Sequence, residues 1–341
     1  MKKEALCFAA PYKTEIREEA IREPAPGELL VRTLVSAISA GTELLIYRGQ
    51  APTELAVDDT IPSLMGNIRF PMKYGYAAVG EVIAVGSGLA DLWHGKKVFA
   101  FNPHESLFLA GPEEVRVLPP DMSAEEAVFF PNMETAITLV TDGKPGIGEQ
   151  VAVFGQGIVG LLVTSILARL PLESLVTLDA HSLRRKTSQE LGAHFSLDPT
   201  APGVLEEALS QLQGPRPHRG ADLTYEVSGD PGALDQAIGV TGYNGRVVIG
   251  SWYGTKRVSL HLGGSFHRSR IRLIGSQVSS ISPELRGRWN KERLGQLAWK
   301  FIRELRPSRL VTHGFRLSEA GEAYRLLDQN AEQTLQVLLT Y

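Results

Sequence analysis

The chain has 341 residues, 43% hydrophobic and 21% charged, with a formal net charge of −3 and a pI near 6.3. This composition is typical of a globular protein of about two domains, and it argues against a basic surface for nucleic acid or an anionic membrane. The single cysteine, Cys7, excludes an internal disulfide and a cysteine-rich zinc site. No signal peptide or membrane-spanning run is expected, so we predict a cytoplasmic protein that acts on a small molecule.

The first hundred residues predict short strands separated by glycine turns, a pattern typical of a barrel-like β domain. A short helix is expected at 44–47, and the proline-rich stretch 50–72 has no clear pattern. That stretch is either a lid or substrate loop or a passive surface loop. The expected strands cover residues 5–9, 29–35, 73–86 and 95–101.

The pattern becomes helical after Ser123, which forms a predicted capping box with Glu126. Pro131 is expected to interrupt this helix before a second one follows. Strands and helices then alternate, which favours an α/β unit with a parallel sheet. Helices are expected at 182–191, 204–212, 233–240, 291–304 and 318–330, and strands at 151–154, 174–178, 221–227, 246–250, 271–274 and 333–340.

A glycine-rich turn follows the buried strand that begins at Val151. Gly155 permits a sharp turn, Gly157 lets the backbone approach a pyrophosphate, and Gly160 lets the next helix pack against the strand. The helix N-terminus then offers N–H groups and a positive dipole end to phosphates. This order of strand, turn and helix predicts a dinucleotide site.

Asp179 ends the next expected strand, 19 positions after Gly160. A carboxylate there binds the ribose hydroxyls of NAD(H) and repels the 2′-phosphate of NADP(H). Arg184 and Arg185 leave NADP(H) open as an alternative, because arginine suits phosphate; Arg185 on a solvated helix face is the other interpretation. Small residues at the ends of the later strands are expected to line the cofactor.

Four segments resemble the medium-chain dehydrogenase/reductase superfamily along nearly the whole chain: 39–43, 74–82, 151–160 and 311–327. The resemblance implies a GroES-like β-barrel catalytic domain over 1–131, a Rossmann doubly wound domain over 132–275 and a C-terminal return over 276–341. It also implies a homodimer, with strands near Arg246–Tyr253 pairing across a twofold axis. It also implies that Thr135 and Arg184 contact the cofactor. The expected cofactor residues are Gly155, Gln156, Gly157, Ile158, Val159, Gly160, Asp179, Arg184, Thr135, Ser228, Gly250, Ser251 and Ser276.

The chain departs from the zinc-bearing members of this superfamily where they carry their metal ligands. The matching positions hold Ala40, Tyr76 and Ala77, and no ligand lies near Pro131. Because a catalytic zinc site needs about three protein ligands, we predict no zinc. The run from Ile38 to Glu43 looks most like the bacteriochlorophyllide a dehydrogenase group, a likeness too short to carry a substrate across.

Without zinc, a side chain must manage the substrate proton. Tyr76 stands at the lost histidine position, where it either donates to substrate or fills space, and Thr42 matches a hydroxyl that relays the proton in zinc members. His104 has a suitable ordinary pKa but is alternatively a surface residue. Glu43 and Glu134 are weaker candidates, and Glu134 alternatively caps a helix.

Three functions follow from this pattern. The first is a zinc-independent NAD(H)-dependent dehydrogenase or ketone reductase acting on a secondary alcohol or carbonyl of a cyclic or polyol substrate. The second is an NAD(P)H-dependent enoyl or quinone reductase. The third is a non-catalytic dinucleotide-binding protein.

Overall fold

The computed structural model describes residues 1–54, 61–89, 91–212 and 219–341, which form two compact units. Unit 1 comprises Met1–Pro131 and Trp299–Tyr341, and unit 2 comprises Asn132–Ala298. The C-terminal return therefore begins at Trp299, so the expected boundary at 276 was wrong. Hydrogen bonds explain the difference, because Ser276 binds Asp142 and Glu284 pairs with Lys144, which ties the segment after 275 to unit 2.

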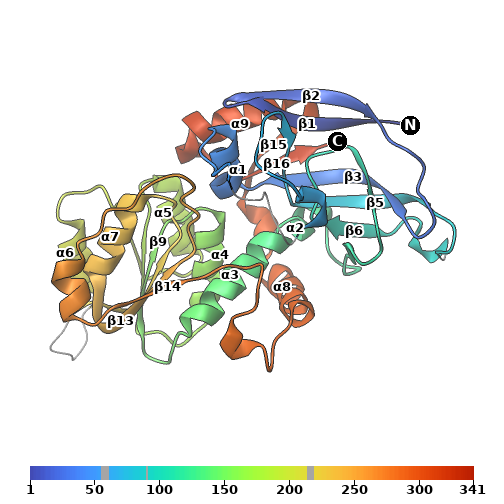
Figure 1. Cartoon of the computed structure of the whole chain (residues 1–341). Coiled ribbons are helices and arrows are strands. Elements are labelled where there is room, and N and C mark those ends of the chain that lie inside the picture. Colours follow the sequence, from blue (N-terminus) through green and yellow to red (C-terminus); the bar gives the residue numbers. More distant parts are fainter. Residues whose placement is uncertain (55–60, 90, 213–218) are drawn as a thin grey trace. The chain divides into compact units, whose positions relative to one another are not determined.

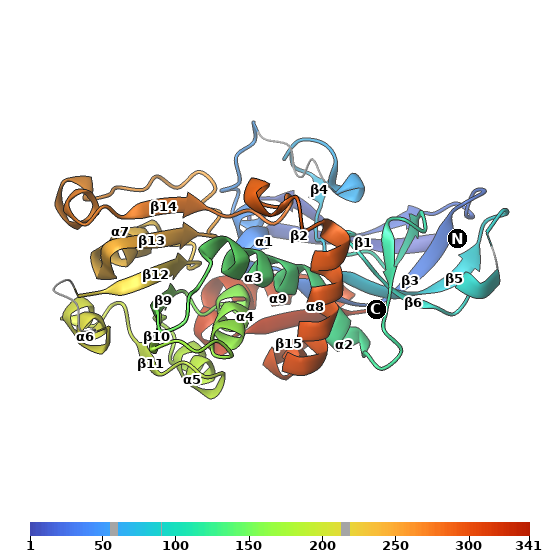
Figure 2. The same cartoon turned by 90° about the horizontal axis from the view of Figure 1, so that it is seen from below.

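Unit 2 contains a parallel sheet (Figure 1), whose described strands follow the order β11-β10-β9-β12-β13-β14, as labelled in Figure 2. This is the doubly wound order 3-2-1-4-5-6, which places a crevice where the order reverses, beside β9 and β12. Every residue of β9 and β10 is buried, as expected for a sheet covered on both faces. The strands are β9 Gln150–Phe154, β10 Ser174–Leu178, β11 Phe195–Leu197, β12 Ala221–Glu226, β13 Thr241–Ile249 and β14 Arg272–Gly275.

Helices accompany the sheet of unit 2, as Figure 2 shows from below. They are α3 Phe130–Gly143, α4 Ile158–Leu167, α5 Ser182–Glu190, α6 Val204–Gln211 and α7 Pro231–Val240. Pro131 does not interrupt the helix as expected; it lies in the first turn of α3, where a missing N–H is tolerated. The break falls earlier, because α2 (Ala124–Ala127) ends before Phe130.

Unit 1 is built on two sheets, with strand orders β2-β1-β4 and β15-β16-β3-β5-β6-β8, and with β7 paired to β3. The strands are β1 Lys2–Ala10, β2 Lys13–Ala20, β3 Leu29–Ile38, β4 Met72–Lys73, β5 Ala78–Val85, β6 Lys97–Ala100, β7 Leu107–Ala110, β8 Val115–Val117, β15 Val311–Arg316 and β16 Gln336–Thr340. The other helices are α1 Ala40–Tyr47, α2 and α9 Ala320–Gln329 in unit 1, and α8 Lys291–Leu305, which begins in unit 2 and ends in unit 1.

Helix α1 is fixed by an apolar core that joins it to β1 and α9. The rings of Phe8 and Tyr324 meet edge-on at 5.2 Å, and Tyr47 lies 5.4 Å from Tyr324. Leu44, Leu45 and Ile46 are buried in the same cluster. This packing sets the position of α1 and therefore of the polar residues at its N-terminus.

Within the described residues, no helix is long and apolar enough to cross a membrane. The proline-rich stretch predicted as a lid or a surface loop lies partly outside the described residues, since 55–60 are not among them. Its described part contains a short turn of helix at Pro62–Leu64.

Candidate functional site

The glycine-rich turn joins β9 to α4 in unit 2. Gly155 has φ = +90°, and a Cβ there would lie 2.5 Å from Ser228 Cα. A Cβ on Gly160 would lie 2.0 Å from the carbonyl oxygen of Gly155. Both positions therefore require glycine for the turn and for close packing.

Gly157 differs from these two glycines because it faces open space. Gly157 is the N-cap of α4 and, as a glycine, has no side chain to make a capping hydrogen bond. A Cβ added to it would have no other atom within 4 Å. A helix N-terminus with vacant space before it is suited to a phosphate group. Ile158 and Val159 open the helix behind it. The turn thus fits the pyrophosphate of a dinucleotide.

Asp179 lies directly after β10 and is 7% exposed. Its Oδ2 accepts the Gln156 N–H at 2.7 Å, and its Oδ1 accepts the His181 N–H at 2.9 Å. The carboxylate is thereby tied to the glycine-rich turn. A carboxylate held beside this turn is suited to the ribose diol of NAD(H).

The two arginines of α5 are both occupied near Asp179. Arg184 lies 3.9 Å from Asp179 Oδ2, and burial lowers its pKa, with the carboxylate opposing this effect. Arg185 donates to the carbonyl oxygens of Asp179 and Ala180 and to Asp198. Arg185 therefore does not lie on a freely solvated face, and a 2′-phosphate would have to compete with these three acceptors.

The expected cofactor residues at the later strands lie at the carboxyl end of one parallel sheet. Ser228, Ser251 and Ser276 follow β12, β13 and β14. Ser251 Oγ accepts the Gly229 N–H at 2.8 Å, and Ser276 Oγ donates to Asp142 at 2.7 Å. A Cβ on Gly250 would lie 2.5 Å from Leu139, so packing against α3 accounts for this glycine.

A buried acid that the sequence analysis missed supports this edge of the sheet. Glu226 is 0% exposed, accepts the Ser228 N–H at 2.8 Å and accepts the Tyr253 hydroxyl. Burial and the carboxylate raise the pKa of Tyr253. The signal for Glu226 in the sequence was an acidic residue at a strand end, two positions before a serine. Glu226 fixes the loop that follows β12.

In unit 1, the structure brings together two of the predicted acid–base residues, Glu43 and His104, which are both 0% exposed. His104 Nε2 and Glu43 Oε2 are 3.0 Å apart, and Ser36 Oγ lies 2.6 Å from His104 Nδ1. Tyr324 also donates to Glu43 Oε2. His104 is thus a buried structural partner and not the surface residue that was the alternative.

Tyr76 and Thr42 lie at more accessible positions of the same unit and are both half-buried. The Tyr76 hydroxyl donates to Ser39 Oγ, and the Ser39 N–H donates to Glu43 Oε1 at 2.7 Å. Thr42 lies in the first turn of α1, next to Glu43. Ser39 links Tyr76 to the buried pair, and sequence reasoning did not single it out because a serine before a helix is ordinarily a cap.

Glu134 and Thr135 lie on α3 in unit 2 and not with the unit 1 residues. Glu134 is 2% exposed, and its carbonyl oxygen accepts the Thr138 hydroxyl at 2.8 Å. Glu134 lies within α3, past the first turn of this helix. Thr135, the next residue, is half-buried.

The donors present do not form a zinc site in the described residues. Ala40 and Ala77 have no donor atom, and the Tyr76 hydroxyl is engaged with Ser39. No group of three or more His, Cys, Asp and Glu side chains there is arranged to hold a metal. His104 and Glu43 are bonded to each other, and no third ligand lies beside them in the part of the chain that the structure describes. Residues 40, 76 and 77 therefore do not fit a catalytic zinc.

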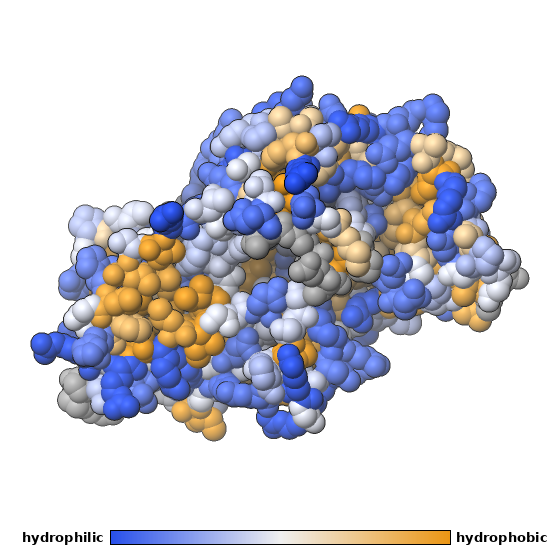
Figure 3. All heavy atoms as spheres, in the orientation of Figure 1, coloured by the Kyte–Doolittle hydropathy of each residue, from blue (hydrophilic) through white to orange (hydrophobic). Residues whose placement is uncertain are grey.

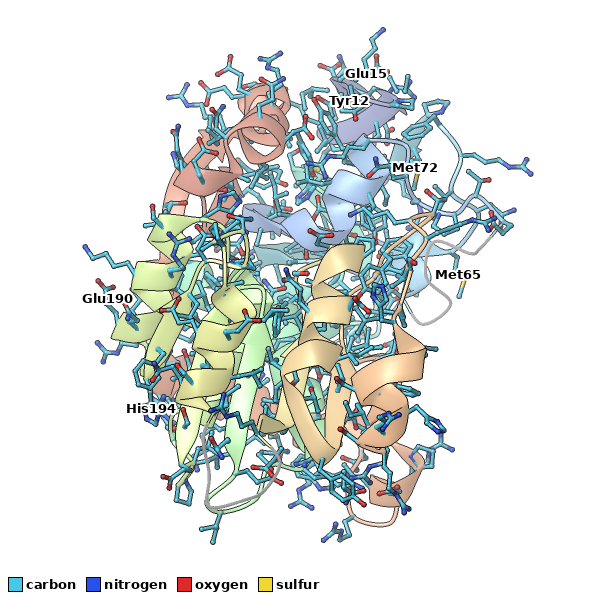
Figure 4. The ribbon with its side chains drawn as sticks, turned by 90° about the vertical axis from the view of Figure 1, so that its left-hand side faces the viewer. Tyr12, Glu15, Met65, Met72, Glu190 and His194 are labelled. Atoms are coloured by element: carbon cyan, nitrogen blue, oxygen red, sulfur yellow. The ribbon has the colours of Figure 1, made fainter. Side chains whose placement is uncertain are left out.

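Unit 1 also has a cavity of about 540 Å³ lined by five charged side chains, four of which form one network of ion pairs. Glu105 binds Lys3 at 2.8 Å and Lys73 at 2.6 Å, and Lys73 also binds Glu19 at 2.9 Å. Met65 and Met72, labelled in Figure 4, line the same cavity. Each charge has an opposite partner, so the cavity offers no unmatched charge to a ligand among these four groups.

Comparison with known proteins relates the chain to dehydrogenases. A family model described as zinc-binding dehydrogenase matches residues 159–292. D-guloside 3-dehydrogenase of Escherichia coli (strain K12) is 23% identical over 351 residues, covering 98% of this chain and 99% of that protein.

Solved structures share the fold across the chain. The 2R,3R-butanediol dehydrogenase of Bacillus subtilis has a TM-score of 0.80 and 20% identity, with 99% of each chain covered. A Sinorhizobium meliloti 1021 protein described as a zinc-binding dehydrogenase, solved with bound NADP, has a TM-score of 0.78 and 19% identity, with 100% of each chain covered. The predicted fold class, a Rossmann sheet with a GroES-like β domain, is confirmed.

Proposed function

We propose that the chain is a member of the medium-chain dehydrogenase/reductase superfamily, an oxidoreductase of the alcohol and polyol type that works without zinc and with NAD(H). It interconverts a secondary alcohol and a carbonyl on a cyclic or polyol substrate. The similarity to D-guloside 3-dehydrogenase supports this substrate class. We also propose a cytoplasmic homodimer.

The observation that carries the proposal is the phenol of Tyr76 at a position that, by resemblance, holds a metal ligand in zinc members. A bound nicotinamide would exchange the hydride with the substrate carbon. Tyr76 gives its proton to the carbonyl oxygen in reduction and takes it from the hydroxyl in oxidation. Thr42, next to the buried Glu43, is proposed to orient the substrate oxygen.

The choice of NAD(H) rests on Asp179. The similar Sinorhizobium meliloti structure contains bound NADP and therefore does not favour NAD(H). Asp179 is held by two backbone N–H groups, which keeps a fixed negative charge beside the turn. Gly155, Gly157 and Gly160 form the pyrophosphate cradle. The negative charge of the Asp179 carboxylate would repel the 2′-phosphate of NADP(H).

The proposed dimer would use a sheet edge different from the one the sequence suggested. Strands near Arg246–Tyr253 were expected to pair across a twofold axis, but β13 is already bonded to β12 and β14 on its two sides. The described sheet has two end strands, β11 and β14, and we propose that the β14 edge, next to β13, forms the interface. Figure 3 shows apolar side chains on the surface of unit 2, in the region where Figure 1 draws α7 and β13.

The test is a screen of cyclic and polyol secondary alcohols with NAD⁺, run on wild type and Tyr76→Phe. We expect turnover by wild type and a loss in kcat of about 10²- to 10⁴-fold in the variant, the range of general acid–base catalysis. Unchanged kcat in Tyr76→Phe would remove the proposed proton-transfer group. Reduction of carbon–carbon double bonds without alcohol oxidation would instead select the enoyl or quinone reductase, and binding without turnover the non-catalytic protein.

A further inference from the structure

Ser39 stands at a helix N-cap but does not act as a cap. Its Oγ makes no bond to the first turn of α1 and accepts the Tyr76 hydroxyl instead. Ser123, the N-cap of α2 in the same unit, behaves in the usual way and accepts the Glu126 N–H at 3.2 Å. The Ser39 hydroxyl is therefore committed to Tyr76 and not to the helix.

The side chain of Glu43, in the helix, bonds back to the backbone of Ser39. Its Oε1 accepts the Ser39 N–H at 2.7 Å, which fixes the Ser39 backbone, and a carboxylate is favourable near a helix N-terminus. His104 and Tyr324 hold the second oxygen of Glu43. Ser39 is thus anchored through a fully buried acid.

His104 also packs beside Tyr76, the partner of Ser39. Gly75 precedes Tyr76 and has φ = +124°, and a Cβ there would lie 2.7 Å from His104 Cδ2 and 2.8 Å from Nε2. The imidazole ring therefore packs directly against the backbone that carries Tyr76. One buried ring contacts Glu43, which holds Ser39, and Gly75, which holds Tyr76.

We propose that Ser39 is the positioning residue for the Tyr76 hydroxyl, and that the buried Glu43–His104 pair keeps the two side chains in register. This inference rests on the proposed function, in which Tyr76 exchanges the substrate proton. It assigns the two buried residues a positioning role in place of the acid–base role expected from the sequence.

The bonding pattern distinguishes positioning from a proton relay. The link from Ser39 to Glu43 runs through a backbone N–H, which orients groups but does not pass a proton. The Ser39 hydroxyl can both accept and donate. It accepts from the neutral phenol. When the Tyr76 O–H bond breaks and a new O–H bond forms on the carbonyl oxygen, whose carbon is reduced by the nicotinamide, the serine O–H turns to donate to the phenolate.

The experiment compares Ser39→Ala, Ser39→Thr and Ser123→Ala in steady-state kinetics. Losing a hydrogen bond to a charged group predicts a fall in kcat of about 10- to 100-fold for Ser39→Ala, with KM nearly unchanged. Ser39→Thr keeps the hydroxyl and should restore kcat to within a few-fold. The control Ser123→Ala removes a true cap, so its thermal midpoint should fall while kcat stays at the wild-type value.

A double-mutant cycle separates this inference from the proposed function. If Ser39 acts through Tyr76, Ser39→Ala adds nothing to Tyr76→Phe. Independent, multiplicative losses would overturn the inference, and so would a wild-type kcat in Ser39→Ala. If Tyr76→Phe itself is without effect, the proposed function fails first.

A measurement that needs no turnover tests the inference even if the protein oxidises none of the alcohols in the screen. The wild-type minus Tyr76→Phe difference in tyrosinate absorbance isolates Tyr76, whose titratable neighbours among the described residues include Tyr74, at 6.1 Å between rings, and the buried Glu43 and His104. Repeating the titration in the Ser39→Ala background should move the Tyr76 signal to higher pH. An unmoved signal would overturn the inference while leaving the cofactor site untouched.

Discussion

The glycine-rich turn makes opposite predictions for two of its glycines. Gly157→Ala places a methyl group in open space at an ordinary φ of −64°, whereas Gly160→Ala drives a Cβ to 2.0 Å from a backbone oxygen. For Gly157→Ala, a poorer N-cap costs a few tenths of a kcal/mol or more, and a less flexible unfolded chain offsets roughly 0.4–1 kcal/mol. The unliganded stability should therefore change by less than about 1 kcal/mol.

The same methyl group occupies the space that a pyrophosphate needs. At an NADH concentration of 100 Kd, binding stabilises wild type by about 2.7 kcal/mol. For a unit of this size, this corresponds to a rise of about 5–11 °C in the thermal midpoint. In Gly157→Ala, NADH fluorescence titration should give at least a tenfold weaker Kd, so the same NADH concentration stabilises the variant by about 1.4 kcal/mol or less and the rise should fall to about half or less.

Gly160→Ala is the matched control for steric strain. It should unfold at a clearly lower temperature even without NADH, because the carbonyl of Gly155 cannot move without breaking the turn. Wild-type NADH affinity in Gly157→Ala would refute the assignment of this turn to the cofactor. A Gly160→Ala protein as stable as wild type would refute the packing argument.

Three further predictions concern Asp179 and the buried tyrosines. Asp179→Asn should weaken NADH binding about tenfold and raise the NADPH-to-NADH preference in parallel titrations, with Asp235→Asn, near the exposed His261, unchanged. Tyr225→Phe should raise the free energy of urea unfolding by about 1 kcal/mol, because the fully buried Tyr225 hydroxyl has no hydrogen-bond partner among the described residues; lower stability would contradict this. Burial raises the pKa of Tyr225 and Tyr324 above the unfolded value, so the folded chain keeps protons that the unfolded chain releases, and the free energy of unfolding should fall as pH rises above about 10. A flat profile up to pH of about 11 would contradict it.

The geometry of the glycine-rich turn was predictable because its signals are local in sequence. Gly155, Gly157 and Gly160 fall within six positions, and Asp179 follows at the end of the next strand. A turn of this kind is specified by backbone conformation and close packing, which only glycine permits. The doubly wound order followed from the alternation of strands and helices.

The polar network of unit 1 was only partly predictable because it depends on tertiary contacts. Glu43 and His104 are 61 positions apart, and Tyr324 is 281 positions from Glu43. The sequence identified Glu43 and His104 as titratable residues but gave no sign that both are fully buried. Strand β15 was missed for a related reason, since its alternating pattern of half-buried and exposed residues includes a glycine and no run of apolar residues.

The most direct test of the central claim is to measure NAD⁺-dependent alcohol oxidation and zinc content on one preparation, before and after treatment with a chelator. The account predicts turnover with no stoichiometric zinc and an unchanged rate after chelation, because Ala40, Tyr76 and Ala77 do not supply three ligands. Stoichiometric zinc, with activity that the chelator abolishes and added zinc restores, would contradict it.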